Sequence, residues 1–469
     1  MNAKIILNNQ FIDSSKSEVQ QINSVLDNSV LGQMECASSE QAIEALKSSE
    51  NAFKSWRYLD LSKRIEILKK VSVLLKNKVE ALSGMLMHEI GKSPDDARSE
   101  IIRSIEYLDM TIEAVKFVNG KVYYGDVFSK YPRNRKTGTY SRVPLGVVLA
   151  ISPFNYPINL SITKIAPALI TGNTVVFKPA GNGCLTAFEF YKTFIEAGLP
   201  EGVLNFITGK SSEIGDTLLT HKSVALIAFT GSTNVGNHIK EVANGIPLLL
   251  ELGGKDNAIV SKNADLELAS SEIATGAFSY SGQRCTAQKL VLVYKEVAEN
   301  LKQKLIDKIS PMKLGPMLNS ESANYVEELI KDAETKGAQI VIRGSRHENI
   351  LSPTVIYGIT PEMRLFYEEQ FGPVLPVSIV EDESDALVKA NLSKYGLQAS
   401  VYTENLEEAY RLADKLEVGS VQINGKGDRG PDNFPFGGVK DSGAMMQGLT
   451  ESLELMTRGK LIVLNLHKI

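Results

Sequence analysis

The spacing of apolar residues predicts helices in the first quarter of the chain. Between about Ser38 and Val118 hydrophobic positions recur every three or four residues, as in IEILKKVSVLLKNKVEALSGMLMHEI. This spacing gathers the apolar side chains on one face of a helix, which can then pack on a core. We therefore expect mostly amphipathic helices over this region.

A second pattern, of short apolar runs separated by helix-like stretches, begins near residue 146. A run such as TVVFK is followed by a stretch such as CLTAFEFYKTFIEAGL, an alternation typical of βαβ units and a parallel sheet. The pattern pauses at PLLLELGGKDNAIV and then resumes, which predicts a second α/β domain. The runs before the pause are VVLAIS, TVVFK, VLNFIT and ALIAFT, and those after it are TAQKLVLVY, QIVIRG, LPVSIVED and SVQIN.

Two segments fit neither pattern. Residues 121–143, KVYYGDVFSKYPRNRKTGTYSRV, are rich in Tyr, Val, Thr, Gly and Pro and predict the two extended arms of a protruding hairpin. The end of the chain, KLIVLNLHKI, predicts a further strand that pairs with these arms. Because an open row of strands invites pairing with another chain, we expect a homodimer or homotetramer.

Composition narrows the class of protein. The 469 residues exceed the ~250 to 300 at which single cores stop growing, so two or more domains are expected. With 43% hydrophobic and 23% charged residues and a net charge of -4, the chain has the composition of a globular protein and no indication of a nucleic-acid partner. No run approaches the ~18 apolar residues of a membrane span, and the N-terminus lacks a signal-peptide core, so we expect no membrane partner.

The three cysteines, Cys36, Cys184 and Cys285, lie far apart and without CxxC spacing. This argues against a disulfide framework and against a thiolate zinc site, so we expect no metal and a reducing, cytoplasmic location. Free cysteines are usually small buried hydrophobic residues. Cys285, in YSGQRCTAQK, therefore becomes a candidate nucleophile only through the segments that accompany it.

Parallel sheets bind ligands beyond the carboxyl ends of their strands, so the residues that follow each run matter most. Four runs end in SPFNYP, KPAGNG, TGKSSEIGD and FTGSTNVG. Gly231 and Gly236 would let the backbone approach a ligand, and the next helix offers free N–H groups to a phosphate. Without the GxGxxG fingerprint, plain turn formation is the commoner reason for such glycines.

Three side chains at these strand ends are candidates for chemistry. Lys178 should emerge at the sheet edge within reach of ribose hydroxyls or a phosphate, unless it is a surface lysine. Glu251 follows three leucines, where desolvation would raise the pKa of its carboxyl toward that of a general base; an edge-strand glutamate facing water is the alternative. Asn155 could donate its amide to an oxyanion, although turn formation also explains an asparagine there.

Together with Cys285, these residues suggest a nucleophile, a base and an oxyanion donor beside a dinucleotide cleft. A cysteine hydrolase would instead need a positioned histidine. The five histidines lie outside the candidate segments, apart from His238 near the edge of FTGSTNVG. Their placement disfavours the protease class.

The order of seven segments makes the chain resemble the aldehyde dehydrogenase superfamily along essentially its whole length. SPFNYP, FKPA, FTGSTNVG, LELGGKD, GQRCTA, EEQFGPV and PFGGVKDSG occur in family order and at family-like spacing. The resemblance implies an α/β fold with a Rossmann-type cofactor domain, an α/β catalytic domain and a small β oligomerisation element. The corresponding boundaries are 1–119 and 143–251 for the first, 252–445 for the second, and 120–142 with 446–469 for the third.

The resemblance also implies roles for individual residues. Cys285 would be the thiolate nucleophile, with the oxyanion held by Asn155 and the Cys285 N–H, and Glu251 would activate the water that hydrolyses the thioester. Because ordinary cysteine has a pKa of about 8.5, Arg284 or the positive nicotinamide ring would assist its ionisation. The positions matching the family's cofactor contacts are Lys178, Gly181, Asp216, Gly231, Ser232, Gly236, Glu369 and Phe371.

Within the superfamily, ISPFNYPINL, GAFSYSGQRCTAQK, YGLQAS and RGPDNFPFGG resemble the non-phosphorylating glyceraldehyde-3-phosphate dehydrogenases. That branch oxidises glyceraldehyde 3-phosphate to 3-phosphoglycerate and holds the phosphate with arginines and a tyrosine, since a guanidinium fork matches phosphate oxygens. A surface or interdomain salt bridge is the alternative for each arginine. The substrate positions implied are Arg103, Tyr156, Arg284, Thr286 and Arg429.

Cofactor choice depends on position 181. NAD-specific relatives often carry a glutamate three residues after the lysine, where its charge disfavours a 2′-phosphate. This chain has Gly181 there, so we expect NADP or NAD to serve, with NADP slightly favoured.

The chain departs from the family pattern at two places. KPAGNG differs from the commoner KP-plus-Ser/Thr endings. PMKLGPM, residues 311–317, is shorter than the family's usual loop, which predicts a structural trimming.

Other functions remain open at this point. Succinate semialdehyde, lactaldehyde or glyceraldehyde would also suit an arginine-rich pocket. An acylating dehydrogenase would pass the acyl group to coenzyme A, but such relatives generally lack a glutamate at the Glu251 position. A non-catalytic structural member is disfavoured because Cys285, Glu251 and Asn155 occur together.

Overall fold

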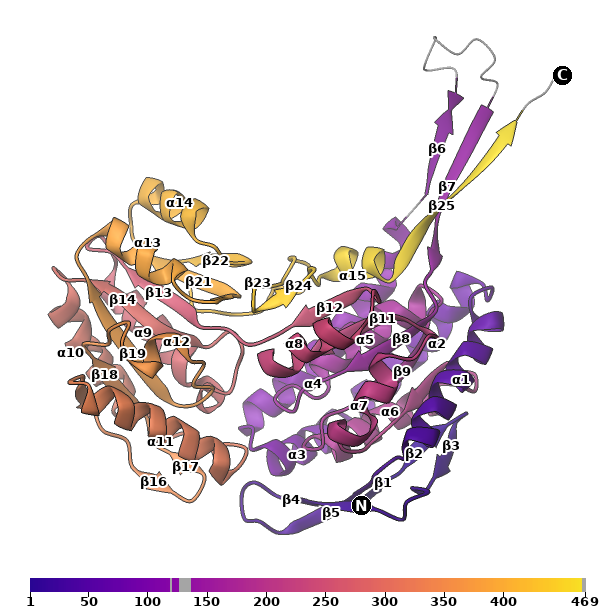
Figure 1. Cartoon of the computed structure of the whole chain (residues 1–469), viewed down its shortest axis with the longest axis horizontal. Helices are drawn as coiled ribbons and strands as arrows, with labels where there is room; N and C mark the ends of the chain where they lie inside the picture. Colours follow the sequence, from indigo (N-terminus) through magenta and orange to yellow (C-terminus); the bar gives the residue numbers. More distant parts are fainter. Residues whose placement is uncertain (119, 126–135, 466–469) are drawn as a thin grey trace.

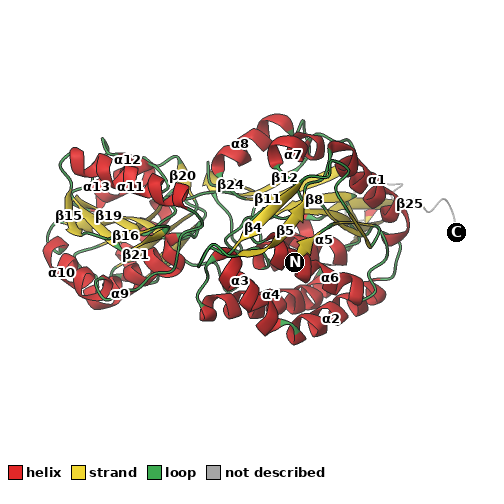
Figure 2. Ribbon diagram, turned by 90° about the horizontal axis from the view of Figure 1, so that it is seen from below, coloured by secondary structure: helices red, strands yellow, loops and turns green. Residues whose placement is uncertain are grey.

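The computed structural model describes residues 1–118, 120–125 and 136–465. Two α/β units lie side by side, and a three-stranded arm projects from the first (Figure 1). Helices cover both faces of the sheet in each unit (Figure 2). No helix within the described ranges is long and apolar enough to cross a membrane. The arrangement confirms the predicted fold class of two α/β bodies with a small β element.

The first unit is built on an eight-stranded sheet with a parallel centre. The predicted runs VVLAIS, TVVFK, VLNFIT and ALIAFT supply four of its strands, and nearly all their residues are buried. Parallel strands covered on both faces appear in a sequence as continuous apolar runs, which is why the pattern marks them clearly. In spatial order the strands are β24 (Gly443–Ala444), β12 (Leu248–Glu251), β11 (Val224–Thr230), β8 (Val147–Ile151), β9 (Thr174–Lys178), β10 (Leu204–Phe206), β2 (Ile5–Leu7) and β3 (Gln10–Ile12).

The helices predicted in the first quarter are present and pack in this unit with those of the βαβ connections. Ser38 begins the first of them through a capping box, in which its hydroxyl accepts from the Gln41 N–H and the Gln41 side chain accepts from the Ser38 N–H. Ser93 caps α4, and Pro94 occupies its first turn. The helices are α1 (Ser39–Trp56), α2 (Leu61–Asn77), α3 (Val79–Ile90), α4 (Pro94–Ala114), α5 (Asn159–Ile170), α6 (Cys184–Glu196), α7 (Ser211–Leu219) and α8 (Thr233–Val242).

The second unit is a seven-stranded sheet that is parallel except at one edge. The four runs after the pause lie in β14, β15, β19 and β22. In spatial order its strands are β15 (Gln339–Ile342), β18 (Thr354–Tyr357), β19 (Val374–Val380), β14 (Gln288–Tyr294), β13 (Asp256–Val260), β21 (Gln398–Tyr402) and β22 (Ser420–Ile423). Its helices are α9 (Leu266–Phe278), α10 (Ala298–Ile309), α11 (Ser320–Thr335), α12 (Arg364–Tyr367), α13 (Glu383–Asn391) and α14 (Leu406–Lys415).

The pause in the sequence pattern holds two strands that belong to different sheets. β12 ends at Glu251 in the first sheet, and β13 begins at Asp256 in the second. Only LGGK, residues 252–255, separates them, so the helix expected between parallel strands is missing and the alternation is interrupted. The crossing sets the carboxyl edge of the first sheet against the amino edge of the second, where the Asn155 amide meets the Gln283 carbonyl at 2.9 Å.

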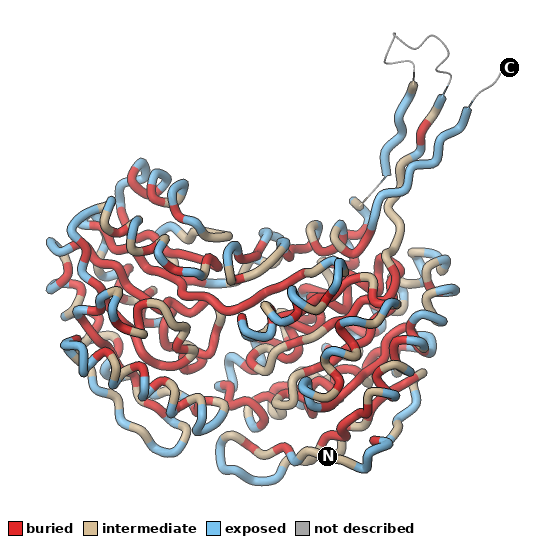
Figure 3. The backbone as a smooth tube through the Cα atoms, in the orientation of Figure 1, coloured by how far each residue is buried: buried red, intermediate tan, exposed pale blue. Residues whose placement is uncertain are grey.

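The projecting arm is a small antiparallel sheet in the order β25 (Thr457–Asn465), β7 (Lys136–Pro144) and β6 (Lys121–Tyr124). The C-terminal strand therefore pairs with the earlier arms, as predicted. Most of its length is exposed (Figure 3). The predicted arm segments 126–135 and 466–469 lie outside the described residues, and α15 (Leu449–Leu455) leads into β25.

The first 35 residues form short strands that the hydrophobic pattern does not mark. β2 and β3 extend the first sheet, while β1, β5 and β4 make a separate three-stranded sheet. Their short length and mixed exposure explain the weak signal in the sequence. The remaining strands are β1 (Asn2–Ala3), β4 (Val19–Asn23), β5 (Val30–Glu35), β16 (Arg346–His347), β17 (Ile350–Leu351), β20 (Tyr395–Gly396) and β23 (Val439–Lys440).

Candidate active site

Cys285 lies in the turn that joins α9 to β14. Before it, Tyr280 and Ser281 adopt left-handed backbone conformations, with φ of 51° and 54°, which cost roughly 1–2 kcal/mol for each residue with a side chain. The Tyr280 hydroxyl donates to the Ile90 carbonyl at 2.8 Å, and the Ser281 hydroxyl donates to the Gly315 carbonyl at 2.7 Å. These bonds hold the strained turn and thereby fix the path of the chain between the end of α9 and Cys285.

A cleft of about 420 Å³ lies beside Cys285, between the two sheet edges. Asn155 also lines it and donates one amide hydrogen to the Gln283 carbonyl. An amide nitrogen carries two donors, so the other can serve an oxygen that gains charge next to the sulfur. The other lining residues from the two units are Ile151, Ser152, Pro153, Phe154, Leu160, Lys178, Pro179, Ala180, Ser211, Phe229, Thr230, Gly231, Ser232, Val235, Leu252, Gly253, Glu369 and Phe371.

Glu251 ends β12 and is buried, with 4% of its surface exposed. β12 is paired on both sides, so the alternative of an edge-strand glutamate facing water is wrong. The expected rise in its pKa is also wrong. Burial raises the pKa of this carboxyl, but the Arg429 guanidinium, the Lys164 ammonium and the Thr230 hydroxyl outweigh burial and hold the pKa below its usual range.

The contacts of Glu251 form a short chain of polar groups. The Thr230 hydroxyl donates to Oε2 at 2.8 Å, and Lys164 Nζ donates to that hydroxyl at 2.6 Å while lying 3.7 Å from Oε2. Arg429 Nη1 lies 3.0 Å from Oε1 and 3.1 Å from Oε2. The carboxylate is therefore held ionised by two cations from separate elements.

The thiol of Cys285 lies where the protonated form is favoured. The residue keeps part of its surface exposed, yet burial raises the pKa of the thiol to about 11, and the Lys289 ammonium offsets only part of the rise. Arg284, expected to assist ionisation, is directed elsewhere. Its guanidinium donates to the Ser279 hydroxyl at 2.7 Å and to the Gly427 carbonyl at 2.6 Å.

Lys178 ends β9, is buried, and donates from Nζ to the Ser211 hydroxyl at 3.1 Å. It lines both the cleft beside Cys285 and a neighbouring hollow of about 380 Å³, so it is not the surface lysine considered as its alternative. Asp216 lines that hollow, and its carboxylate lies 2.7 Å from His238 Nε2. The two spaces are adjacent and share Lys178 as a common wall.

The predicted glycines occupy different settings. Gly231 lines the cleft. Gly236 does not line either space, and the expectation that it admits a ligand needs correction. A Cβ at 236 would come 2.3 Å from a methyl of Leu252, so close packing of α8 requires glycine there. Gly181 has room for a side chain, because the nearest atom to a Cβ would be Met34 Cε at 3.6 Å.

Ser232, Glu369 and Phe371 all line the cleft. Ser232 caps α8 with its hydroxyl. Glu369 Oε1 accepts from the Gly254 N–H at 3.0 Å, so this carboxylate lies against the connector of residues 252–255. Phe371 has a φ of 40° and packs edge-on against Phe154, with 6.1 Å between ring centroids. The first two come from opposite sides of the cleft, in the two different units.

Two of the three arginines predicted to bind a phosphate already pair with carboxylates. Arg103 makes a bidentate pair with Asp432, with both nitrogen–oxygen distances at 2.8 Å, so the salt-bridge alternative describes Arg103 in this structure. Arg429 pairs with Glu251. Arg284 has no carboxylate partner among the described residues.

Tyr156 and Thr286, the other two predicted substrate residues, flank the nucleophile. Lys92 Nζ lies 3.5 Å from the ring centroid of Tyr156, and burial raises the pKa of the Tyr156 phenol to about 12. The phenol therefore remains a hydrogen-bond donor at neutral pH. Thr286 follows Cys285 and is buried, and its carbonyl packs against Gly427.

Three buried lysines near the candidate nucleophile are not predicted from the sequence. Lys164 touches the Thr230–Glu251 pair, and Lys289 donates to the Cys285 carbonyl. Lys92 lies over Tyr156 and pairs with Glu100. A signal was present for two of them: one lysine interrupts the apolar helix NLSITKIAPALI and another the apolar strand QKLVLVY.

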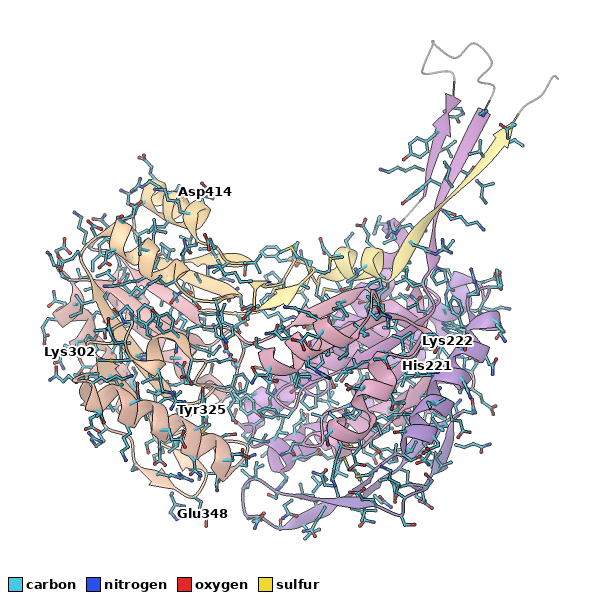
Figure 4. The ribbon with its side chains drawn as sticks, viewed as in Figure 1. His221, Lys222, Lys302, Tyr325, Glu348 and Asp414 are labelled. Carbon is cyan, nitrogen blue, oxygen red and sulfur yellow. The ribbon has the colours of Figure 1, made fainter. Side chains whose placement is uncertain are left out.

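The described histidines do not reach Cys285. None lines the cleft. His221 lies in the first unit, away from the second (Figure 4), and its Nδ1 contacts the Ser223 hydroxyl. His467 lies outside the described residues. In the same described ranges, no group of three His, Cys, Asp or Glu side chains is placed to hold a metal ion.

Comparison with known proteins decides the family. The family model described as "Aldehyde dehydrogenase family" matches residues 11–462. The chain belongs to the aldehyde dehydrogenase family. Among its relatives in that family, the NADP-dependent glyceraldehyde-3-phosphate dehydrogenase of Streptococcus equinus is 44% identical over 93% of this chain and 94% of the relative. The enzyme of the same name from Pisum sativum is 41% identical over 92% and 89%.

A solved structure from this aldehyde dehydrogenase family has the same fold throughout. The NADP-dependent glyceraldehyde-3-phosphate dehydrogenase of Bacillus halodurans C-125, complexed with NADP, aligns with a TM-score of 0.98 at 42% identity and covers 100% of both chains. The resemblance inferred from seven ordered segments is thereby confirmed. It extends through the arm and through both sheets.

Proposed function

We propose that this aldehyde dehydrogenase oxidises glyceraldehyde 3-phosphate irreversibly to 3-phosphoglycerate, with NADP as the preferred electron acceptor and NAD as a weaker one. Relatives named for this activity support the proposal. The observation that carries it is Arg284, which is buried beside Cys285 without a carboxylate partner among the described residues. A buried cation with no counter-charge favours an anionic ligand.

In the proposed acylation, the Cys285 thiol gives up its proton to solvent, the resulting thiolate sulfur bonds to the aldehyde carbon, and the carbonyl oxygen becomes an oxyanion. The Asn155 amide and the Cys285 N–H hold that oxyanion. When bound, NADP accepts the two electrons of the oxidation as a hydride. Re-formation of the carbonyl leaves a thioester on Cys285.

In the proposed deacylation, Glu251 takes a proton from water as the water oxygen bonds to the thioester carbon. The carbon–sulfur bond then breaks, the sulfur leaves as a thiolate, and the acid is released. The depressed pKa of Glu251 keeps the carboxylate ionised at neutral pH, which is the form that a general base requires.

The residues present fit a dinucleotide. Two adjacent spaces have a two-lobed shape that suits a molecule with a base at each end. The residues that line both are Ile151, Lys178, Ser211, Phe229 and Val235. We propose that Lys178 and Glu369 hold the two riboses, that Ser232 and the start of α8 face the pyrophosphate, and that Phe371 flanks the nicotinamide. Gly181 lacks the acidic side chain that would repel a 2′-phosphate.

Replacing Arg284 with methionine tests the substrate. Methionine keeps the unbranched apolar stem of the side chain but removes its charge, so kcat/KM for glyceraldehyde 3-phosphate should fall about a hundredfold, while kcat/KM for unphosphorylated glyceraldehyde changes only a few-fold. Both are measured as NADPH formation, with NAD as the comparison cofactor. Arg343 is exposed and pairs with Glu334. The Arg343→Met variant is therefore the matched control and should keep wild-type kinetics. Equal kcat/KM on both aldehydes in the wild-type enzyme would contradict the proposal.

We propose that the protein resides in a reducing, cytoplasmic compartment, because its three cysteines are unpaired thiols.

We also propose that the protein functions as a homodimer or homotetramer assembled through the arm. Exposed apolar side chains of this extent usually mark an interface; on the arm they are Val122, Tyr123, Tyr124, Leu461, Ile462, Val463 and Leu464. Sedimentation velocity should give two or four times 51.3 kDa. A 51.3 kDa species at micromolar concentration would refute assembly.

A further inference from the structure

Arg429 and Glu251 form a buried ion pair at the centre of the candidate site. The side chain of Arg429 is 13% exposed and that of Glu251 is 5% exposed. A single nitrogen, Nη1, lies 3.0 Å from Oε1 and 3.1 Å from Oε2, and only Oε2 meets hydrogen-bond geometry. The pair therefore lacks the two parallel bonds of a bidentate guanidinium–carboxylate contact.

The neighbouring pair is built differently. Arg103 and Asp432 are joined by two bonds of 2.8 Å through separate nitrogens. An incoming anion would have to break both of those bonds to claim Arg103, but only one aligned bond to claim Arg429. Of the two arginine–carboxylate pairs, the one that includes the candidate base is thus the easier to exchange.

The three arginines meet around one segment of chain, residues 427–432. Arg284 donates to the Gly427 carbonyl at 2.6 Å, and Arg103 donates to the Arg429 carbonyl. Arg429 therefore lies in the same cluster as Arg284, which we propose attracts the substrate's phosphate. A phosphate dianion carries twice the charge of a carboxylate, and it competes with Glu251 for the same guanidinium.

We propose that Arg429 switches from Glu251 to the phosphate of the bound acyl group, and that this exchange frees Glu251 to activate water. The inference rests on the proposed function, since it needs a phosphorylated substrate. Arg429 then contributes to specificity at the hydrolysis step as well as at binding. A substrate without phosphate acylates Cys285 but leaves Glu251 engaged by Arg429, so its thioester hydrolyses slowly.

Phosphite dianion added separately to an unphosphorylated acyl-enzyme tests the exchange. The wild-type enzyme is acylated with isotopically labelled glyceraldehyde and NADP in a rapid mixer, and loss of label from the protein is followed with and without phosphite. We expect phosphite to speed hydrolysis by about tenfold or more, a fraction of what a general base can contribute. The measurement concerns hydrolysis alone, so effects on acylation do not enter.

Two variants locate the effect. In Arg429→Gln, Glu251 is no longer paired with a guanidinium, so hydrolysis should be fast without phosphite and should not respond to it. In Arg103→Gln, the Arg429–Glu251 pair is intact, so phosphite should still stimulate hydrolysis. The wild-type measurement decides the proposal even if a variant fails to fold.

The outcomes separate this inference from the function on which it rests. No phosphite stimulation in the wild type, or unchanged stimulation in Arg429→Gln, overturns the exchange while leaving oxidation of glyceraldehyde 3-phosphate intact. If glyceraldehyde 3-phosphate is itself no better a substrate than glyceraldehyde, the proposed function fails instead.

Discussion

The Cys285→Ala variant is expected to lose aldehyde oxidation almost completely. Alanine removes the sulfur that would form the thioester, and without a covalent intermediate kcat should fall by about 10⁴-fold or more. NADP binding should persist, because the proposed cofactor contacts Lys178 and Glu369 lie on other elements. Stopped-flow NADPH absorbance measures the first effect, and fluorescence titration with NADP measures the second.

Cys36→Ala is the matched control, since Cys36 is a buried thiol that does not line the cleft. It should retain activity. Wild-type turnover in Cys285→Ala would refute the assignment of the nucleophile.

In the wild type, alkylation of Cys285 by iodoacetamide should accelerate as the pH rises toward about 11, because burial raises the pKa of this thiol and the thiolate is the reacting form.

The Glu251→Gln variant is expected to stop after one half-reaction. Glutamine keeps the size of the side chain but cannot take a proton from water, so hydrolysis of the thioester should slow by about 10²- to 10⁴-fold. Acylation does not use this carboxylate. Rapid mixing should therefore show a burst of about one NADPH per subunit followed by very slow turnover, and mass spectrometry should find the acyl group on Cys285.

A matched carboxylate far from the cleft serves as the control for this variant. Glu381 is exposed and pairs with Lys295 on the second unit, so Glu381→Gln should show wild-type kinetics. Steady turnover without a burst in Glu251→Gln would contradict a general-base role. Loss of the burst itself would mean that Glu251 is needed before the thioester forms.

Much of the fold could be predicted because its parallel strands are buried on both faces. VVLAIS and ALIAFT appear as continuous apolar runs, and helix α1 carries its own capping box at Ser38. The strands of residues 1–35 were not predicted, since they are short and only partly buried. The LGGK connector appears in the sequence only as a pause, because no helix separates the two strands that it joins.

Several of the residues predicted from the sequence line one cleft, but the electrostatics at Glu251 differ from those predicted. The preceding leucines left both a buried and an exposed Glu251 open. The carboxyl is buried, yet its pKa is lowered, because Arg429, 178 residues later in the chain, lies 3.0 Å away. No local pattern contains that proximity. Lys164 illustrates the same limit, because a charge within an apolar helix signals burial without naming the partner it meets.

The four residues LGGK, 252–255, also determine how closely the segments of the candidate site can approach one another. A Cβ at Gly253 would come 2.2 Å from Glu369 Oε2, and a Cβ at Gly254 would come 2.7 Å from Asp256 Oδ1 and 3.1 Å from the Cys285 carbonyl. A methyl group at position 253 would push the connector away from the Glu369 carboxylate, and one at position 254 would push it away from Asp256 and the Cys285 carbonyl. The close approach of the connector to Glu369 and to the Cys285 carbonyl thus depends on the absence of side chains at Gly253 and Gly254, rather than on either hydrophobic core.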